Sequence, residues 1–181
     1  MQPALVQPSL VEEFTRAAIQ AVASVRVVER SPQALREALL EAVADAPTIL
    51  YAPPRELPAE LFSEFLTDPR VRMNPAPEEM ANSAAGVTEA FAAVASTGSV
   101  CIDVSFERTG MVSLLAPLQV VVVAAESIVP QPRDLFRADV LEGRGLQRDF
   151  VFVTGPSATA DMGPLVRGVH GPHRLHILLL R

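Results

Sequence analysis

The chain has 181 residues, a net charge of −6 and 49% hydrophobic residues, enough for one domain with a single packed core. The acidic balance argues against binding to a nucleic-acid backbone, and the lack of lysine among the 15 basic residues excludes Schiff-base chemistry and the usual P-loop. One cysteine permits no intrachain disulfide, and no apolar window is long enough to span a membrane, so we expect a cytoplasmic protein.

The first half of the chain alternates helices with strands. Ser9 to Glu12 has the form of a capping box, and the apolar spacing that follows predicts a helix over about 10–24, an appendage to a single domain spanning 1–181. A strand over 25–29 and a helix that begins at Pro32 come next. A strand over 48–52, a helix from Pro58 and a strand over 70–73 complete this half. The alternation predicts an α/β fold with a mainly parallel sheet covered on both faces.

The second half is rich in strands. The segment 86–99 carries alanines that suit a helix and larger apolar residues that suit strands, and we predict two strands that turn at Thr97 and Gly98. The continuous apolar run over 120–124 predicts a central strand buried on both faces. A helix over 130–136, a turn at 143–145 and a last strand over 175–180 follow.

A candidate ligand-binding loop follows the apolar residues 150–153, which predict a buried strand. Pro156 suits the first position of a short helix, so the pattern predicts a strand-to-helix turn whose free amides and hydroxyls would bind an anion. The alternative is a tight turn with a capping serine, in which Asp161 bonds to Arg167 or to a backbone amide. The ligand-binding residues predicted here are Thr154, Gly155, Pro156, Ser157, Thr159 and Asp161.

His170 is the candidate catalytic acid or base, because Gly168 and Gly171 flank it and let the backbone approach a ligand closely. A structural hydrogen bond is the alternative role. The even spacing of His170, His173 and His176 also suggests a metal site. We predict none, since Gly171 and the proline after it prevent the helix that would align the first two, and no nearby Cys, Asp or Glu completes the set.

Further polar residues could line the same pocket. Thr97, Gly98 and Ser99 could contribute a glycine and two hydroxyls, although a plain hairpin turn explains them equally well. Thr88 is a weaker candidate. Cys101 lies within an apolar strand and is expected to be an inert core residue.

Three groups of residues together resemble the lactate-utilisation (LUD) domain family, and within it the LutC-like branch. They are Gly86–Thr88 with Ala95–Ser99, Ser113–Pro117, and Thr154–Asp161 with Gly168–Pro172. The resemblance implies a three-layer α/β/α sandwich like that of the NagB/RpiA/CoA-transferase group. It also implies a part in oxidising L-lactate to pyruvate together with partner proteins, which would carry the iron–sulfur clusters while this chain binds no cofactor.

The chain departs from the family pattern at three positions. Ser96 and Gly163 stand where an acidic residue is frequent, and Gln119 stands where a histidine is. Two other functions therefore stay open. One is a stand-alone transferase or ligase acting on a phosphorylated, folate or coenzyme A substrate, and the other is a non-catalytic scaffold subunit.

Overall fold

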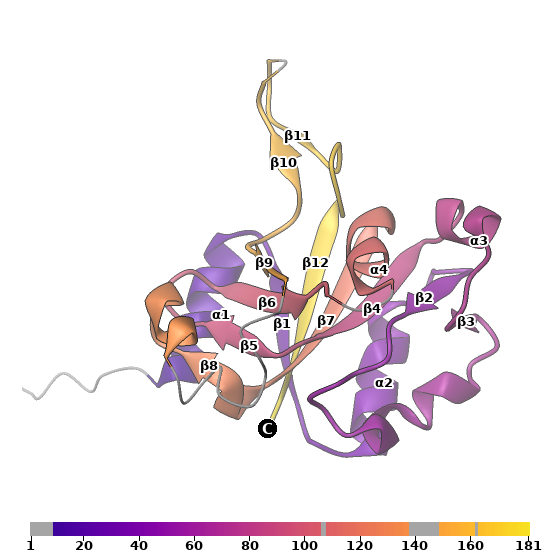
Figure 1. The fold of residues 1–181 in the computed structure, drawn as a ribbon, viewed down its shortest axis with the longest axis horizontal. Helices are drawn as coiled ribbons and strands as arrows, with labels where there is room; N and C mark the ends of the chain where they lie inside the picture. The colour runs from indigo at the N-terminus through magenta and orange to yellow at the C-terminus, as the bar shows by residue number, and fades with distance from the viewer. Residues whose placement is uncertain (1–8, 106–107, 138–148, 162) are drawn as a thin grey trace, which may run out of the picture.

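A six-stranded sheet forms the centre of the computed structural model, which describes residues 9–105, 108–137, 149–161 and 163–181 (Figure 1). The strand order is β1-β12-β7-β4-β2-β3, and every neighbouring pair is parallel. The two longest strands, β7 and β12, carry long apolar runs and lie inside the sheet, where both of their faces are covered. The bounds are β1 Ser24–Val28, β2 Ile49–Tyr51, β3 Val71–Arg72, β4 Ala85–Ala90, β7 Leu118–Ala124 and β12 Arg174–Leu180.

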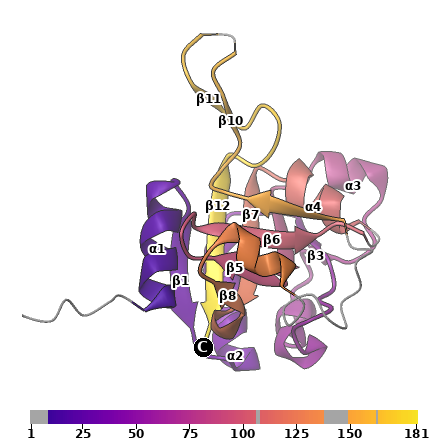
Figure 2. The ribbon, with the colours of Figure 1, turned by 60° about the vertical axis from the view of Figure 1, so that its left-hand side comes forward.

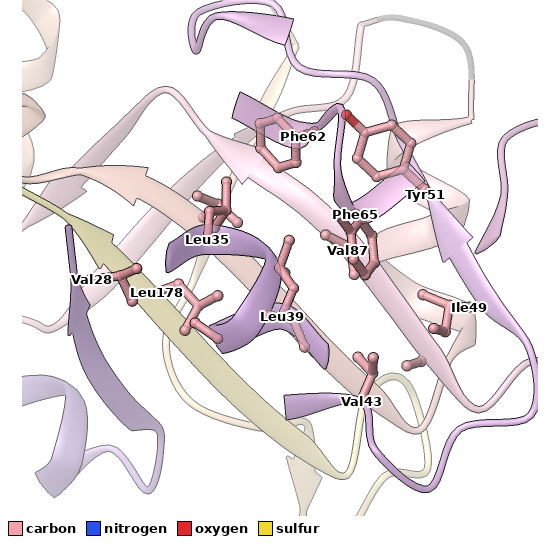
Figure 3. Close-up of a cluster of buried hydrophobic side chains, with 14 of the residues drawn as sticks. Val28, Leu35, Leu39, Val43, Ile49, Tyr51, Phe62, Phe65, Val87 and Leu178 are labelled. Carbon is pink, nitrogen blue, oxygen red and sulfur yellow. The ribbon is translucent and has the colours of Figure 1, made fainter. Parts of the chain in front are cut away.

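One face of the sheet is covered by α2 (Pro32–Ala42) and two short 3-10 helices, η1 (Ala59–Phe62) and η2 (Phe65–Thr67). Ser31 caps α2 by accepting a hydrogen bond from the amide of Ala34, and a proline occupies the first turn. Leu35 and Leu39 then point from α2 onto the sheet beside Phe62 and Phe65 (Figure 3). This apolar layer holds the loop after β2 in place.

Arg70 closes the C-terminal end of α2, which has no basic residue in its last turn. Its Nη1 donates to the carbonyl oxygens of Val43, Ala44 and Ala46 at 3.0–3.2 Å, while Asp68 holds the other side of the guanidinium. The carbonyls left unpaired at a helix end need such donors. This arginine thereby joins the end of α2 to the segment that leads into β3.

The opposite face is covered by α1 (Leu10–Gln20), α4 (Thr109–Leu115) and a second sheet (Figure 2). The second sheet has the order β8-β5-β6-β9 and contacts the parallel sheet through a cluster of small and β-branched side chains. Phe14 and Ala18 of α1 are fully buried in that cluster, so α1 is part of the core. The bounds are β5 Ala92–Val94, β6 Ser99–Asp103, β8 Ile128–Val129 and β9 Phe150–Val153.

The remaining elements lie at the periphery. A narrow antiparallel hairpin of β10 and β11 rises from the body of the molecule, and we call residues 156–172 the arm (Figures 1 and 2). The short helices follow prolines or lie in the loops between strands. The bounds are α3 Pro77–Ala81, η3 Ala125–Ser127, η4 Pro132–Phe136, β10 Ala158–Thr159 and β11 Val166–Arg167.

The predicted α/β class with a mainly parallel sheet is confirmed. The capping box at Ser9, the helix from Pro32, the hairpin at Thr97–Gly98 and the central strand over 120–124 are confirmed as well. The predicted helix from Pro58 is instead two short 3-10 turns. The predicted turn at 143–145 lies outside the described residues.

The strand-to-helix turn predicted after residue 153 is wrong. Phe150–Val153 does form a strand, but it is the half-exposed edge strand of the second sheet, antiparallel to β6. Pro156 starts no helix, because the chain continues into the strands of the arm. The free helix amides on which the anion-binding prediction rested are therefore absent from this described segment.

Candidate functional site

The structure brings together three of the predicted hydroxyls, although they come from distant parts of the chain. The Ser99 hydroxyl lies 2.7 Å from the hydroxyls of both Thr97 and Thr154. This hydroxyl chain links the turn before β6 to the end of β9. Thr97 and Thr154 are exposed, whereas Ser99 is buried between them.

The glycines beside the hydroxyl chain face helix α1. A Cβ at Gly98 would lie 2.1 Å from the amide nitrogen of Ala18, and a Cβ at Gly155 would lie 1.9 Å from the carbonyl oxygen of Ala21. Both glycines also have a positive φ, 66° and 69°. Both glycines were predicted to lie at a ligand, whereas the group that comes close to each of them is the backbone of α1 or of its C-terminal cap.

The base of the arm holds another part of the predicted loop. The Ser157 amide donates to the Pro172 carbonyl, and the Gly168 amide donates to the Ser157 carbonyl, each at 2.9 Å. A Cβ at Gly168 would overlap the His173 ring, and one at Gly171 would lie 3.2 Å from the Ser157 Cβ. These contacts give the two glycines a packing role at the point where the arm leaves the body.

The other predicted residues are scattered. The Thr159 hydroxyl donates to the Asp161 carboxylate at 3.1 Å on the exposed arm, where His170 is exposed and Pro156 is partly buried. Thr88 is buried on β4, and its hydroxyl has no hydrogen-bond partner among the described residues. His170 and Thr88 thus lie on different parts of the molecule.

A pocket lies elsewhere, at the carboxyl ends of β2 and β4. In the sheet, β3 lies at the edge, on one side of β2, and β4 lies on the other side. The chain therefore runs from β2 to the edge strand β3, crosses back over β2 to β4, and later adds β7 and β12 beyond β4. The connections therefore leave β2 and β4 in opposite directions, and open parallel sheets bind ligands at such a topological switch point. We call this cavity the switch-point pocket.

The switch-point pocket has two adjoining parts, which share Ala52, Pro53 and Thr109. The larger part measures about 370 Å³ and is further lined by Tyr51, Met73, Asn74 and Arg108. The smaller part is a recess of about 20 Å³, further lined by Arg55, Glu56, Glu89, Phe91 and Asp103. The larger part offers the cation of Arg108 and neutral donors, and the recess adds three acidic residues and a second arginine, Arg55.

Glu89 organises the recess from the end of β4. Its carboxylate accepts hydrogen bonds from three successive backbone amides, those of Arg55, Glu56 and Leu57, in the loop after β2. Burial raises the pKa of the Glu89 carboxyl above its usual range, and the three amide bonds oppose that rise. Burial, assisted by the charge of Glu89, also raises the pKa of Tyr51, whose hydroxyl therefore remains a donor.

Helix α4 supplies the opposite wall of the pocket, and two contacts fix it on the sheet. The buried Gln119 of β7 donates to the Ser113 hydroxyl at 2.7 Å. Gly86 of β4 leaves room for the carbonyl of Val112, which would lie 2.2 Å from a Cβ at that position. Arg108 immediately precedes α4, and its Nη1 donates to the Pro75 carbonyl at 3.3 Å. The guanidinium is thereby held at the rim.

The sequence interpretation did not single out Glu89 or Arg108, which line the switch-point pocket. A signal for Glu89 was present, because it is the only charged residue in the otherwise apolar and small-residue run 84–95. Nothing in the local sequence around Arg108 distinguishes it from the other arginines. Its place beside the pocket depends on how α4 packs on β4 and on the hydrogen bond that joins α4 to β7.

Cys101 is expected to be chemically silent in the folded protein. It is fully buried, and burial raises the pKa of its thiol to about 12. At pH 8 only about one thiol in ten thousand would then be the reactive thiolate. Ellman's reagent should label the native protein only at its rate of unfolding, and should label it at once in denaturant. Stoichiometric labelling of native protein within minutes would contradict this burial.

The fold and the pocket define an open α/β protein with a candidate ligand site at the carboxyl edge of a parallel sheet. The chain belongs to the LUD domain family, whose sequence model matches residues 17–180. Among the described residues, no helix has both the length and the apolar character needed to cross a lipid bilayer.

Two curated relatives are both named Lactate utilization protein C. The one from Bacillus subtilis is 34% identical over 99 residues, which cover 52% of this chain and 41% of the relative. The one from Bacillus licheniformis is 35% identical over 91 residues, which cover 48% and 38%. The matched region thus spans less than half the length of either relative.

The fold is also seen in the crystal structure of a DUF162 family protein from Deinococcus radiodurans. The two structures superpose with a TM-score of 0.69 over 95% of this chain and 96% of the other, at 20% sequence identity. Because the identity is low, the similarity concerns the fold alone.

Proposed function

We propose that this chain is a LutC-like component of a cytoplasmic system that oxidises L-lactate to pyruvate, and that it binds a small anionic ligand in the switch-point pocket. The observation that carries the site is the position of Arg108, Asn74 and Thr109 around one cavity at the carboxyl ends of β2 and β4. Family membership and the names of the two relatives support the pathway.

The chemistry of the larger part suits a carboxylate. An arginine guanidinium presents donors in a fork that matches the two oxygens of a carboxylate, and the Thr109 hydroxyl and the Asn74 amide add neutral donors at the same rim. A volume of about 370 Å³ lies within the range of small-molecule sites. The proposal therefore places the anionic end of the ligand beside Arg108.

Electron transfer is assigned to partner subunits. An iron–sulfur cluster normally takes four thiolates, whereas this chain has a single cysteine that lies in the core. The proposed role is thus to bind the organic ligand within a larger assembly whose iron–sulfur proteins carry the electrons.

A thermal-shift experiment tests the proposal. A ligand at 100 times its dissociation constant should stabilise the protein by about 2.7 kcal/mol, a shift of several degrees. We expect L-lactate or pyruvate to produce it in the wild type, and Arg108→Gln to abolish it. His170→Ala and Ser157→Ala should leave it unchanged, because both residues belong to the arm.

Two outcomes would contradict the proposal. Loss of the shift in His170→Ala and Ser157→Ala, with Arg108→Gln unaffected, would place the ligand at the arm instead. Stabilisation by coenzyme A, a folate or a sugar phosphate, with no response to lactate or pyruvate, would favour a stand-alone transferase or ligase.

A further inference from the structure

Glu89 holds a carboxylate in the recess of the switch-point pocket, which adjoins the part that contains Arg108. A carboxylate has about four acceptor positions on its two oxygens. Three N–H donors, from Arg55, Glu56 and Leu57, bond to it. They make four contacts, two on each oxygen, because the Glu56 amide is shared between both oxygens at 3.1 and 3.2 Å. A donor that enters the recess can take over one of these two shared contacts.

The size of the recess limits what that group can be. Its volume of about 20 Å³ is enough for about one water-sized group, such as a hydroxyl. The adjoining part of about 370 Å³ holds the remainder of a small ligand. A ligand with its carboxylate at Arg108 would therefore place one short substituent in the recess.

We infer that Glu89 makes the switch-point pocket selective for a 2-hydroxy acid over the matching 2-oxo acid, by accepting a hydrogen bond from the ligand hydroxyl in the recess. This inference rests on the proposed function. A hydroxyl donates to the Glu89 carboxylate, whereas a keto oxygen can only accept and would face a like partial charge. Sites built to bond a hydroxyl reject analogues that cannot make that bond.

The fixed geometry of Glu89 strengthens the selection. Its carboxylate is held by backbone amides of a loop that packs on the core through the buried Leu57, so it cannot turn away from an unsuitable ligand. The acid is thus a specificity-determining residue, and its proposed contact is with the ligand hydroxyl.

Isothermal titration of the full chain with L-lactate and with pyruvate tests this inference. The wild type should bind L-lactate about tenfold or more tightly than pyruvate, the usual effect of one hydrogen bond to a charged group. Glu89→Gln keeps the shape of the side chain but also offers an N–H group, so the preference should disappear or reverse. Glu60→Gln, which removes an exposed acid from η1, should keep the wild-type ratio.

The outcomes separate this inference from the proposed function. If both acids bind, Arg108→Gln weakens both and Glu89→Gln leaves their ratio unchanged, the selective role of Glu89 is wrong while the pocket stands. If the wild type binds neither acid, both proposals fail. Circular dichroism on Glu89→Gln checks that the variant is folded, and a ratio that changes in folded protein supports the inference.

Discussion

Replacing Gly98 with alanine should lower the free energy of unfolding by about 3–5 kcal/mol. The new Cβ would lie 2.1 Å from the amide nitrogen of Ala18, inside the backbone of α1. The positive φ of 66° adds a conformational cost for any residue with a Cβ. Because the contact is with backbone, no side-chain rotation relieves it, and α1 must move away from the cluster that buries Phe14.

Urea denaturation of Gly98→Ala beside Gly110→Ala measures this effect. Gly110 lies in α4, and a Cβ there would meet only the Val104 side chain at an ordinary 3.6 Å. Alanine at this helical position should be neutral or stabilise by up to about 1 kcal/mol. A loss below about 1 kcal/mol for Gly98→Ala would show that α1 does not pack against this turn.

Replacing Gly86 with alanine should damage both stability and ligand binding. The added Cβ would lie 2.2 Å from the Val112 carbonyl oxygen. Strand β4 is held between β7 and β2, so α4 is the element that must give way. Overpacking of this kind costs about 1–3 kcal/mol, and lifting α4 displaces Arg108 and Thr109 from the rim. We expect lactate affinity to fall at least about tenfold.

Gly98→Ala serves as the matched control for that loss of affinity. It strains the α1 side of the second sheet and leaves α4 untouched, so its folded fraction should bind lactate as the wild type does. Titration at a temperature where both variants are folded separates the effects. Equal loss of affinity in the two variants would mean that the binding change reflects general destabilisation, and would argue against α4 as a wall of the site.

The class of fold could be predicted because strong local signals agreed with the tertiary arrangement. The apolar run in β7 is too long and too continuous for a strand with an exposed face, which requires a central position. Ser9 and Ser31 cap their helices as the pattern indicated. These signals depend on neighbours in sequence, so no tertiary information was needed.

The strand β9 shows where such signals fail. An apolar run predicts a strand but does not say which sheet it joins. The Phe150 ring contacts the rings of Phe91, Phe136 and Phe152 at centroid distances of 5.4–6.1 Å and is therefore half-buried. These aromatic contacts cover part of the apolar surface of β9, although the strand lies at the edge of a small sheet. An aromatic edge of this kind cannot be told from a buried parallel strand by sequence pattern.

The candidate site was harder to predict than the fold, for two physical reasons. A glycine that leaves space for a ligand cannot be told by sequence from a glycine that leaves space for a packed helix. Gly98 and Gly155 leave space for the backbone of Ala18 and Ala21, in and next to α1. The residues of the switch-point pocket come from the carboxyl ends of β2, β3, β4 and β6, the loop after β2 and the start of α4. Their convergence is set by strand order, which local sequence does not encode.

Amide chemical shifts measured during a titration with L-lactate test most directly whether the ligand binds at the carboxyl ends of β2 and β4. The largest changes should fall on the amides of Arg55, Glu56 and Leu57, which bond to Glu89, and on that of Thr109. Changes confined to Thr154, Ser157 and His170 would instead place the ligand at the arm and contradict the account.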